Sequence, residues 1–168
     1  AGLRILLVED NAINQQVAEE LLSGQGAAID IADNGLRGVE AVQAALATGR
    51  PYDAVLMDMQ MPDLDGIELT QILRQHESLF DIPVIFLTSV SDPGLLRGAL
   101  RAGADALLSK GDDPELILSV IQRRIQRFRR VTYTLTRDPL TRLYNRPALM
   151  ERVSFELQRA QRDEQAFC

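Results

Sequence analysis

Residues 54–66 read AVLMDMQMPDLDG: an apolar run ends at a single carboxylate, Asp58, and a turn containing Pro62 follows. A run without polar residues is typical of a strand that is buried on both faces of a parallel sheet. Four further runs are mostly apolar in the same way, and they lie at residues 3–8, 27–32, 82–87 and 106–109. The sequence therefore predicts five strands in a parallel sheet.

Amphipathic stretches separate these runs, as expected for helices that cover the faces of a sheet. They lie at residues 12–23, 35–48, 65–76 and 93–102, and turn or cap signals bound them. The alternation of five strands with four helices predicts an α/β domain with a doubly wound sheet. Asp113 and Pro114 are favourable at a helix start, and they predict a further, extended C-terminal helix.

Polar side chains stand where the predicted strands end. Glu9 and Asp10 follow the first strand, Asp58 the third, Thr88 the fourth and Lys110 the fifth. The carboxyl ends of parallel strands meet at one edge of a sheet, so we expect these side chains to converge. Singly, each has a structural explanation, because aspartates cap helices and threonines end strands. Together, three close carboxylates repel one another unless a cation lies among them, and oxygen ligands suit Mg²⁺.

Lys110 is the only lysine among 18 basic residues. A sequence so rich in arginine would supply arginine wherever a generic positive charge sufficed. A compact ammonium reaches between a carboxylate and a phosphoryl oxygen in a way that a planar guanidinium does not. This composition supports a specific role for Lys110.

Residues 3–122 resemble the response-regulator receiver domain. Four pieces carry the resemblance: ILLVEDN at 5–11, VLMDMQMPDLDG at 55–66, LTS at 87–89, and the segment from Gly103-Ala104-Asp105 to Lys110. The resemblance implies a flavodoxin-like sheet with strand order 2-1-3-4-5.

The resemblance also assigns roles to residues at the strand ends. It implies that Asp58 accepts a phosphoryl group from a histidine kinase or a phosphotransfer protein. It implies that Thr88 is a switch hydroxyl and that Lys110 is the salt-bridge partner of the phosphoryl group. The implied Mg²⁺ ligands are Glu9, Asp10, Asp58 and the backbone carbonyl of Gln60.

Two positions depart from the family pattern. Leu107 stands where many members have an aromatic residue, so coupling of Thr88 to a rotating ring is in doubt. Gly111 stands where members usually have a cis-forming proline, which leaves the turn more flexible. Neither position takes part in the phosphoryl chemistry.

The last predicted helix carries apolar residues at alternating spacings of three and four. They are Leu118, Ile121, Ile125, Phe128 and Leu135, with Thr132 completing the series. The spacing predicts a parallel coiled-coil stalk that forms a homodimer. The alternative is one long amphipathic helix that packs on its own domain.

Residues 138–146, DPLTRLYNR, resemble the entry motif of GGDEF domains, Asp-x-Leu-Thr-Gly-Leu-x-Asn-Arg, with Arg142 in place of glycine. The expected organisation is a receiver domain at 1–122, a helical stalk at 123–137 and the first piece of a GGDEF domain at 138–168. No Gly-Gly-Asp/Glu-Glu-Phe segment is present, so we expect only phosphorylation and dephosphorylation of this chain itself. The expected parent protein is a diguanylate cyclase, or a degenerate relative that serves as a sensor or scaffold.

Composition excludes several classes of protein. Residues 1–115 carry a net charge of −12 and residues 116–168 a net charge of +6, which suggests a domain boundary or a change of role near residue 115. The arginines of the second part follow a helical pattern with few aromatic residues, so nucleic-acid binding is not expected. One cysteine, Cys168, excludes a disulfide framework. No run is long enough to cross a bilayer and no secretory signal is seen, so we expect a cytoplasmic protein.

Three rival functions share parts of this pattern. A receiver fold that binds partners without phosphorylation would not need the full set of strand-end residues. A phosphatase with an aspartate nucleophile needs an acid/base aspartate two residues later, where Gln60 stands. A flavin-binding domain needs a phosphate-cradling loop after the first strand, where Glu9 and Asp10 would repel phosphate.

Overall fold

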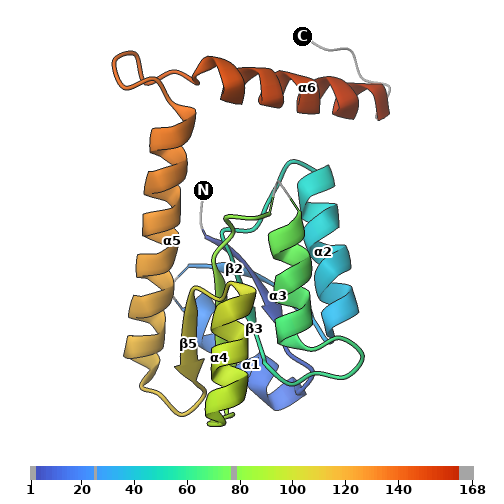
Figure 1. Cartoon of the computed structure of the whole chain (residues 1–168), viewed down its shortest axis with the longest axis vertical. Helices are drawn as coiled ribbons and strands as arrows, with labels where there is room; N and C mark the ends of the chain where they lie inside the picture. The colour runs from blue at the N-terminus through green and yellow to red at the C-terminus, as the bar shows by residue number, and fades with distance from the viewer. Residues whose placement is uncertain (1–2, 25, 77–78, 163–168) are drawn as a thin grey trace. The chain divides into compact units, whose positions relative to one another are not determined.

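The computed structural model describes residues 3–24, 26–76 and 79–162. The chain forms two compact units, residues 1–125 and residues 126–168. In the first unit, five parallel strands form one sheet in the order β2-β1-β3-β4-β5 (Figure 1), which confirms the predicted flavodoxin-like order. The strands are β1 Arg4–Val8, β2 Ala28–Ala32, β3 Ala54–Met57, β4 Val84–Thr88 and β5 Ala106–Ser109.

The fourth strand begins at Val84, two residues later than the sequence predicts. Pro83 explains the difference, because proline has no N–H to donate to a sheet ladder. Its carbonyl still accepts a hydrogen bond from the Val55 amide at 2.8 Å, so the chain is aligned before the strand starts.

Helices follow the strands where the amphipathic pattern predicts them. They are α1 Ala12–Ser23, α2 Gly35–Ala47, α3 Gly66–Gln75, α4 Pro93–Ala102, α5 Pro114–Thr136 and α6 Arg146–Arg162. Side chains cap the first four: Asn11, Asn34, Asp65 and Asp92 each accept hydrogen bonds from amides of the first turn. The caps place the start of each helix directly after the carboxyl-edge loops.

Both faces of the sheet are covered at its centre, which is why the middle strand β3 is fully buried and carries no polar residue. In β1, Leu6 and Val8 lie in an apolar cluster with residues of α2, α3 and α4. Ile5 and Leu7 lie in a second cluster with residues of α1 and α5. The domain is therefore a three-layer α/β fold with helices on both faces.

The predicted extended C-terminal helix is confirmed as α5, which has 23 residues. Its first half packs on the sheet: Ile121 and Ile125 are each 1% exposed, and Leu118 is partly buried beside them. These side chains of the predicted dimer seam are thus covered by their own domain. This packing agrees with the alternative prediction, in which one long amphipathic helix packs on its own domain. Phe128 is half-buried and Leu135 is 66% exposed.

The second unit contains a turn between the end of α5 and α6. The Asp138 carboxylate accepts hydrogen bonds from the amides of Leu140 and Thr141 at 3.1 and 2.8 Å. The Asn145 side chain donates to the carbonyl of Leu135 at 2.6 Å and accepts from the amide of Ala148 at 3.1 Å. Residues 138–146, which resemble the GGDEF entry motif, therefore form a hydrogen-bonded turn that a capped helix follows.

None of the helices in the described ranges is long and apolar enough to cross a membrane.

Candidate functional site

The polar residues predicted at the strand ends do come together at the carboxyl edge of the sheet. Sheet hydrogen bonds continue past the strands and fix the backbone there: the Asp58 amide donates to Val8 at 2.9 Å, and the Glu9 amide donates to Ala32 at 3.0 Å. The Lys110 amide donates to the Thr88 carbonyl at 3.1 Å. The residues that follow β1, β3 and β5 are therefore held in register with the ends of the neighbouring strands by the backbone.

Asp58 is the central carboxylate of this edge. Its Oδ2 accepts from the Lys110 ammonium at 2.7 Å, and its Oδ1 accepts from the Met59 amide at 2.6 Å. The side chain is 14% exposed, so it is held in place and still open to solvent. Close packing fixes the loop behind it, because a Cβ on Gly66 would lie 2.4 Å from the Asp58 carbonyl oxygen.

Glu9 lies deeper, with 2% of its surface exposed. Its Oε2 lies 2.7 Å from the Lys110 ammonium, and its Oε1 accepts from the Asn14 side-chain amide at 2.9 Å. Gln15 donates to the Glu9 backbone carbonyl at 2.6 Å. A buried carboxylate is stable only when its oxygens are hydrogen-bonded or paired, and both oxygens of Glu9 meet this condition.

Asp10 completes the acidic cluster. One carboxylate oxygen from each of Glu9, Asp10 and Asp58 lies within 4.8 Å of the others. Lys110 pairs with two of the three carboxylates, Glu9 and Asp58, so negative charge is in excess in this cluster. A hard divalent cation such as Mg²⁺ fits this set, because it prefers several oxygen ligands, at least some of them charged. Gln60, predicted as a further ligand through its carbonyl, follows in the same loop and is exposed.

Lys110 stays charged between its two carboxylates. Burial disfavours the charged ammonium, but hydrogen bonds to Asp58 and Glu9 and attraction to their charges outweigh burial and raise the pKa of Lys110. A permanently charged ammonium at 2.7 Å from Asp58 can offset negative charge that arrives on that carboxylate.

Thr88 is 3% exposed, and its hydroxyl accepts a hydrogen bond from the Val90 amide at 3.0 Å. It thus lies at the predicted edge, with its hydroxyl held by its own loop. Leu107 packs partly buried against the apolar cluster that includes residues of α4. Gly111 donates its amide to the Ser109 hydroxyl at 3.1 Å, and no peptide bond in the described ranges is cis.

The sequence reading missed Asn14 and Gln15, the two amide side chains that hold Glu9. Their signal was present as a run of amides around the first turn of α1, with Asn at 11 and 14 and Gln at 15 and 16. A helix start brings side chains of its first turn back toward the preceding loop, so donors there can reach the acidic pair.

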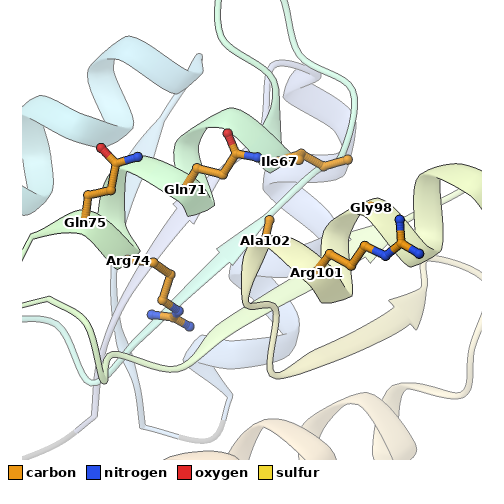
Figure 2. Close-up of a pocket in the computed structure, with 7 residues that line it drawn as sticks. All are labelled: Ile67, Gln71, Arg74, Gln75, Gly98, Arg101 and Ala102. Carbon is orange, nitrogen blue, oxygen red and sulfur yellow. The ribbon is translucent and has the colours of Figure 1, made fainter.

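A separate groove of about 450 Å³ lies between α3 and α4. Figure 2 shows Gln71 and Gln75 from α3 and Arg101 and Ala102 from α4 around it. Its lining contains no carboxylate, and it shares no residue with the acidic cluster. The groove therefore lacks the carboxylate ligands that make the carboxyl edge a candidate metal site.

Comparison with known proteins agrees with the geometry of this edge. A family model for the response regulator receiver domain matches residues 5–122. The gliding motility regulatory protein of Myxococcus xanthus is 38% identical over 125 residues, which are 74% of this chain and 15% of that protein. The sensor histidine kinase GacS of Pseudomonas protegens is 36% identical over 110 residues, 64% of this chain and 12% of that protein. The chain thus spans less than a sixth of either relative.

One solved structure adds a metal to the comparison. The receiver domain of a sensor histidine kinase from Pseudomonas aeruginosa is 36% identical, with a TM-score of 0.65 over 75% of this chain and 99% of that one. That structure has a magnesium ion coordinated in its active site cleft.

Proposed function

Because the chain belongs to the response regulator receiver family, the phosphoacceptor modules of two-component phosphorelay systems, we propose that Asp58 accepts the phosphoryl group. The observation that carries this proposal is the ammonium of Lys110 on Asp58 Oδ2 within a cluster of three carboxylates. Asp58 follows β3, the middle strand of the sheet, and it remains partly open to solvent.

The transfer step follows from the contacts of Asp58. A carboxylate oxygen of Asp58 attacks phosphorus, the phosphorus–nitrogen bond of a phosphohistidine breaks, and a proton returns to the imidazole of the donor. The donor is a histidine kinase or a phosphotransfer protein. Lys110 offsets the negative charge of the transferring group, and the Met59 amide holds the other carboxylate oxygen in place.

The acidic cluster is the proposed site for Mg²⁺. The residues that would hold it are Glu9, Asp10, Asp58 and the backbone carbonyl of Gln60. When bound, the metal supplies positive charge that stabilises the phosphoryl oxygens. The carboxylates themselves exclude other anions from this edge until that charge is present.

Thr88 is the proposed switch residue, because it is buried, its carbonyl accepts from the Lys110 amide, and the present hydrogen bond of its hydroxyl is to a loop amide. Release from the Val90 amide would let the hydroxyl turn toward a phosphoryl group. Leu107 provides no aromatic ring to follow this turn, and it packs on the apolar cluster that includes residues of α4, so the proposed carrier of the signal is a movement of α4.

The test of the main proposal is acyl phosphorylation of the chain. Incubation with acetyl phosphate and Mg²⁺ should add one phosphoryl group, measured by intact-protein mass spectrometry, and omission of Mg²⁺ should suppress the addition. Asp58→Asn should remove it, while Asp63→Asn, in the same loop, should not. An unmodified wild-type protein would instead support the rival in which the fold only binds partners.

We also propose that the parent protein carries a diguanylate cyclase output. Arg142 has a φ of 59°, in the left-handed region that favours glycine, and the resembling motif has glycine at this position. The local backbone is thus compatible with the GGDEF entry motif. In the parent protein, beryllofluoride with Mg²⁺ should increase cyclic di-GMP synthesis, and Asp58→Asn should abolish the increase. Equal synthesis in both states would contradict this output.

A homodimer through the end of α5 is the proposed arrangement for such an output. Ile121 and Ile125 are already buried on the sheet, so the contact must use the later residues of the helix, with Phe128, Val131 and Leu135 as apolar candidates. Leu135→Arg should shift a dimer to monomer in sedimentation, whereas Leu36→Arg, at an exposed position on α2, should leave it unchanged. A monomeric wild-type protein under phosphorylating conditions would contradict the stalk.

A further inference from the structure

We propose that Asn14 is a positioning residue for the metal site: its amide holds Glu9 so that one carboxylate oxygen faces the acidic cluster. This inference rests on the proposed function, because it concerns the Mg²⁺ site of the phosphoacceptor edge. Asn14 is the third residue of α1 and is half-buried. Its side-chain amide donates to Glu9 Oε1 at 2.9 Å.

The two oxygens of Glu9 have different partners. Oε1 meets only neutral donors, Asn14 at 2.9 Å and the Asn11 amide at 3.4 Å. Oε2 meets the Lys110 ammonium at 2.7 Å, between Glu9 and Asp58. The hydrogen bond from Asn14, together with the ion pair to Lys110, therefore fixes the rotation of the carboxylate, with one oxygen toward α1 and the other toward the cluster.

A neutral donor suits this position for an electrostatic reason. A second cation beside Glu9 would cancel the negative charge that attracts a divalent ion, whereas an amide stabilises the buried carboxylate without changing the net charge. Groups that orient a metal ligand in this way contribute strongly to affinity, and their loss typically weakens metal binding by about 10- to 100-fold.

Gln15 acts on the same residue by another route. Its side chain donates to the Glu9 backbone carbonyl at 2.6 Å, which fixes the main chain and leaves the carboxylate free to rotate. Only Asn14 and Lys110 provide side-chain donors to the Glu9 carboxylate among the described residues. Asn14 is therefore the residue whose loss should act on the carboxylate alone.

The test is Mg²⁺ titration of the chain by calorimetry, with Asn14→Leu as a variant of similar size that cannot donate. Gln16→Leu is the matched control, because Gln16 lies on the same helix, is exposed and donates to Glu20 at 2.9 Å. We expect Asn14→Leu to weaken Mg²⁺ binding by about tenfold and the control to stay within about twofold.

A second readout separates positioning from a general loss of structure. Without Mg²⁺, Asn14→Leu should lower the thermal midpoint by about 3 °C, because a buried carboxylate oxygen loses its near donor. In a Glu9→Met background, where no carboxylate remains to hold, the same substitution should have no effect on the midpoint. An effect of equal size in both backgrounds would overturn the inference.

The metal titration also distinguishes two failures. A wild-type protein that binds no Mg²⁺ would overturn the proposed metal site and this inference with it. A wild-type protein that binds Mg²⁺, together with an Asn14→Leu variant of equal affinity, would overturn the role of Asn14 and leave the proposed function intact.

Discussion

The two edges of the sheet are built from the same kinds of side chain but differ in charge balance. At the amino edge two arginines each pair with a carboxylate: Arg4 with Asp30, and Arg74 with Asp105 at 2.9 Å. At the carboxyl edge three carboxylates lie together, and two of them, Glu9 and Asp58, share the ammonium of Lys110. These two arginines are paired one to one, whereas the acidic cluster of the second edge keeps an excess of negative charge.

Arg74 also makes several hydrogen bonds to backbone carbonyls at the amino edge. Its guanidinium donates to the carbonyls of Phe80 and Ile82, each at 2.9 Å, and to that of Gly103 at 2.8 Å. It thereby ties the end of α3 to the start of β4 and to the loop before β5. Gly103 has a φ of 107°, and a Cβ there would lie 2.9 Å from the Arg74 Nε.

The net charge of an ion cluster thus indicates whether the cluster stabilises the fold or is kept to bind a ligand. A balanced cluster with every donor used holds elements of the fold together. A cluster with uncompensated charge destabilises the protein that carries it, and such cost is typical of sites kept for a ligand. Substitutions at the two edges should therefore have opposite effects on stability.

The largest effect is expected for Arg74→Met at the amino edge. It leaves Asp105 without its cation and several carbonyls without a donor, so the free energy of unfolding should fall by about 3 kcal/mol. Urea denaturation measures the change. Arg97→Met, at an exposed position on α4, is the control and should change stability by less than about 0.5 kcal/mol. A small effect of Arg74→Met would break the comparison.

A smaller loss is expected for Tyr52→Phe, also at the amino edge. The Tyr52 hydroxyl donates to Asp30 at 2.7 Å, so its removal should lower the free energy of unfolding by about 1 kcal/mol at neutral pH. Urea denaturation at pH 7 measures it, and an unchanged midpoint would contradict it.

The same hydroxyl should make stability depend on alkaline pH. Burial, followed by the hydrogen bond to Asp30 and its charge, raises the pKa of Tyr52 to about 12. The unfolded chain loses this proton first, near pH 10, so the contribution is complete below about pH 10 and is lost as pH rises through about 12. Tyr52→Phe should reduce the loss of stability in that window. An identical pH profile in both proteins would exclude Tyr52 as its source.

The smallest effect, with the opposite sign, is expected for Asp10→Asn at the carboxyl edge. Removal of one of three close carboxylates should raise the free energy of unfolding by about 0.5 kcal/mol in Mg²⁺-free buffer. Added Mg²⁺ should cancel the advantage, because it stabilises the wild-type protein by binding to it. Thermal unfolding with and without Mg²⁺ measures both. A variant less stable than the wild type in the absence of metal would contradict excess charge at this edge.

The fold could be predicted from the sequence because burial on both faces of a parallel sheet leaves a simple signal. The convergence of Glu9, Asp10, Asp58 and Lys110 followed from strand polarity alone. Asn14 could not be found in this way, because its role depends on the direction of one side chain and not on a period in the sequence.

The predicted seam of α5 shows a different limit. A three-four spacing marks an apolar stripe on a helix, but it does not say what covers the stripe. Here Ile121 and Ile125 pack on the sheet of their own domain, whereas Leu135 is exposed. Periodicity therefore predicted the helix and its apolar face. Only the packing in the structure showed that the sheet of the same domain covers the first part of that face.

If the excess charge at the carboxyl edge serves phosphorylation of Asp58, chemical mapping of the modified residue should locate the phosphoryl group there. The chain is phosphorylated with acetyl phosphate and Mg²⁺ and then reduced with borohydride, which converts an aspartyl phosphate to homoserine. Tandem mass spectrometry of its peptides locates the product. We predict homoserine at position 58 alone. Homoserine at another aspartate, with position 58 unchanged, would contradict the account.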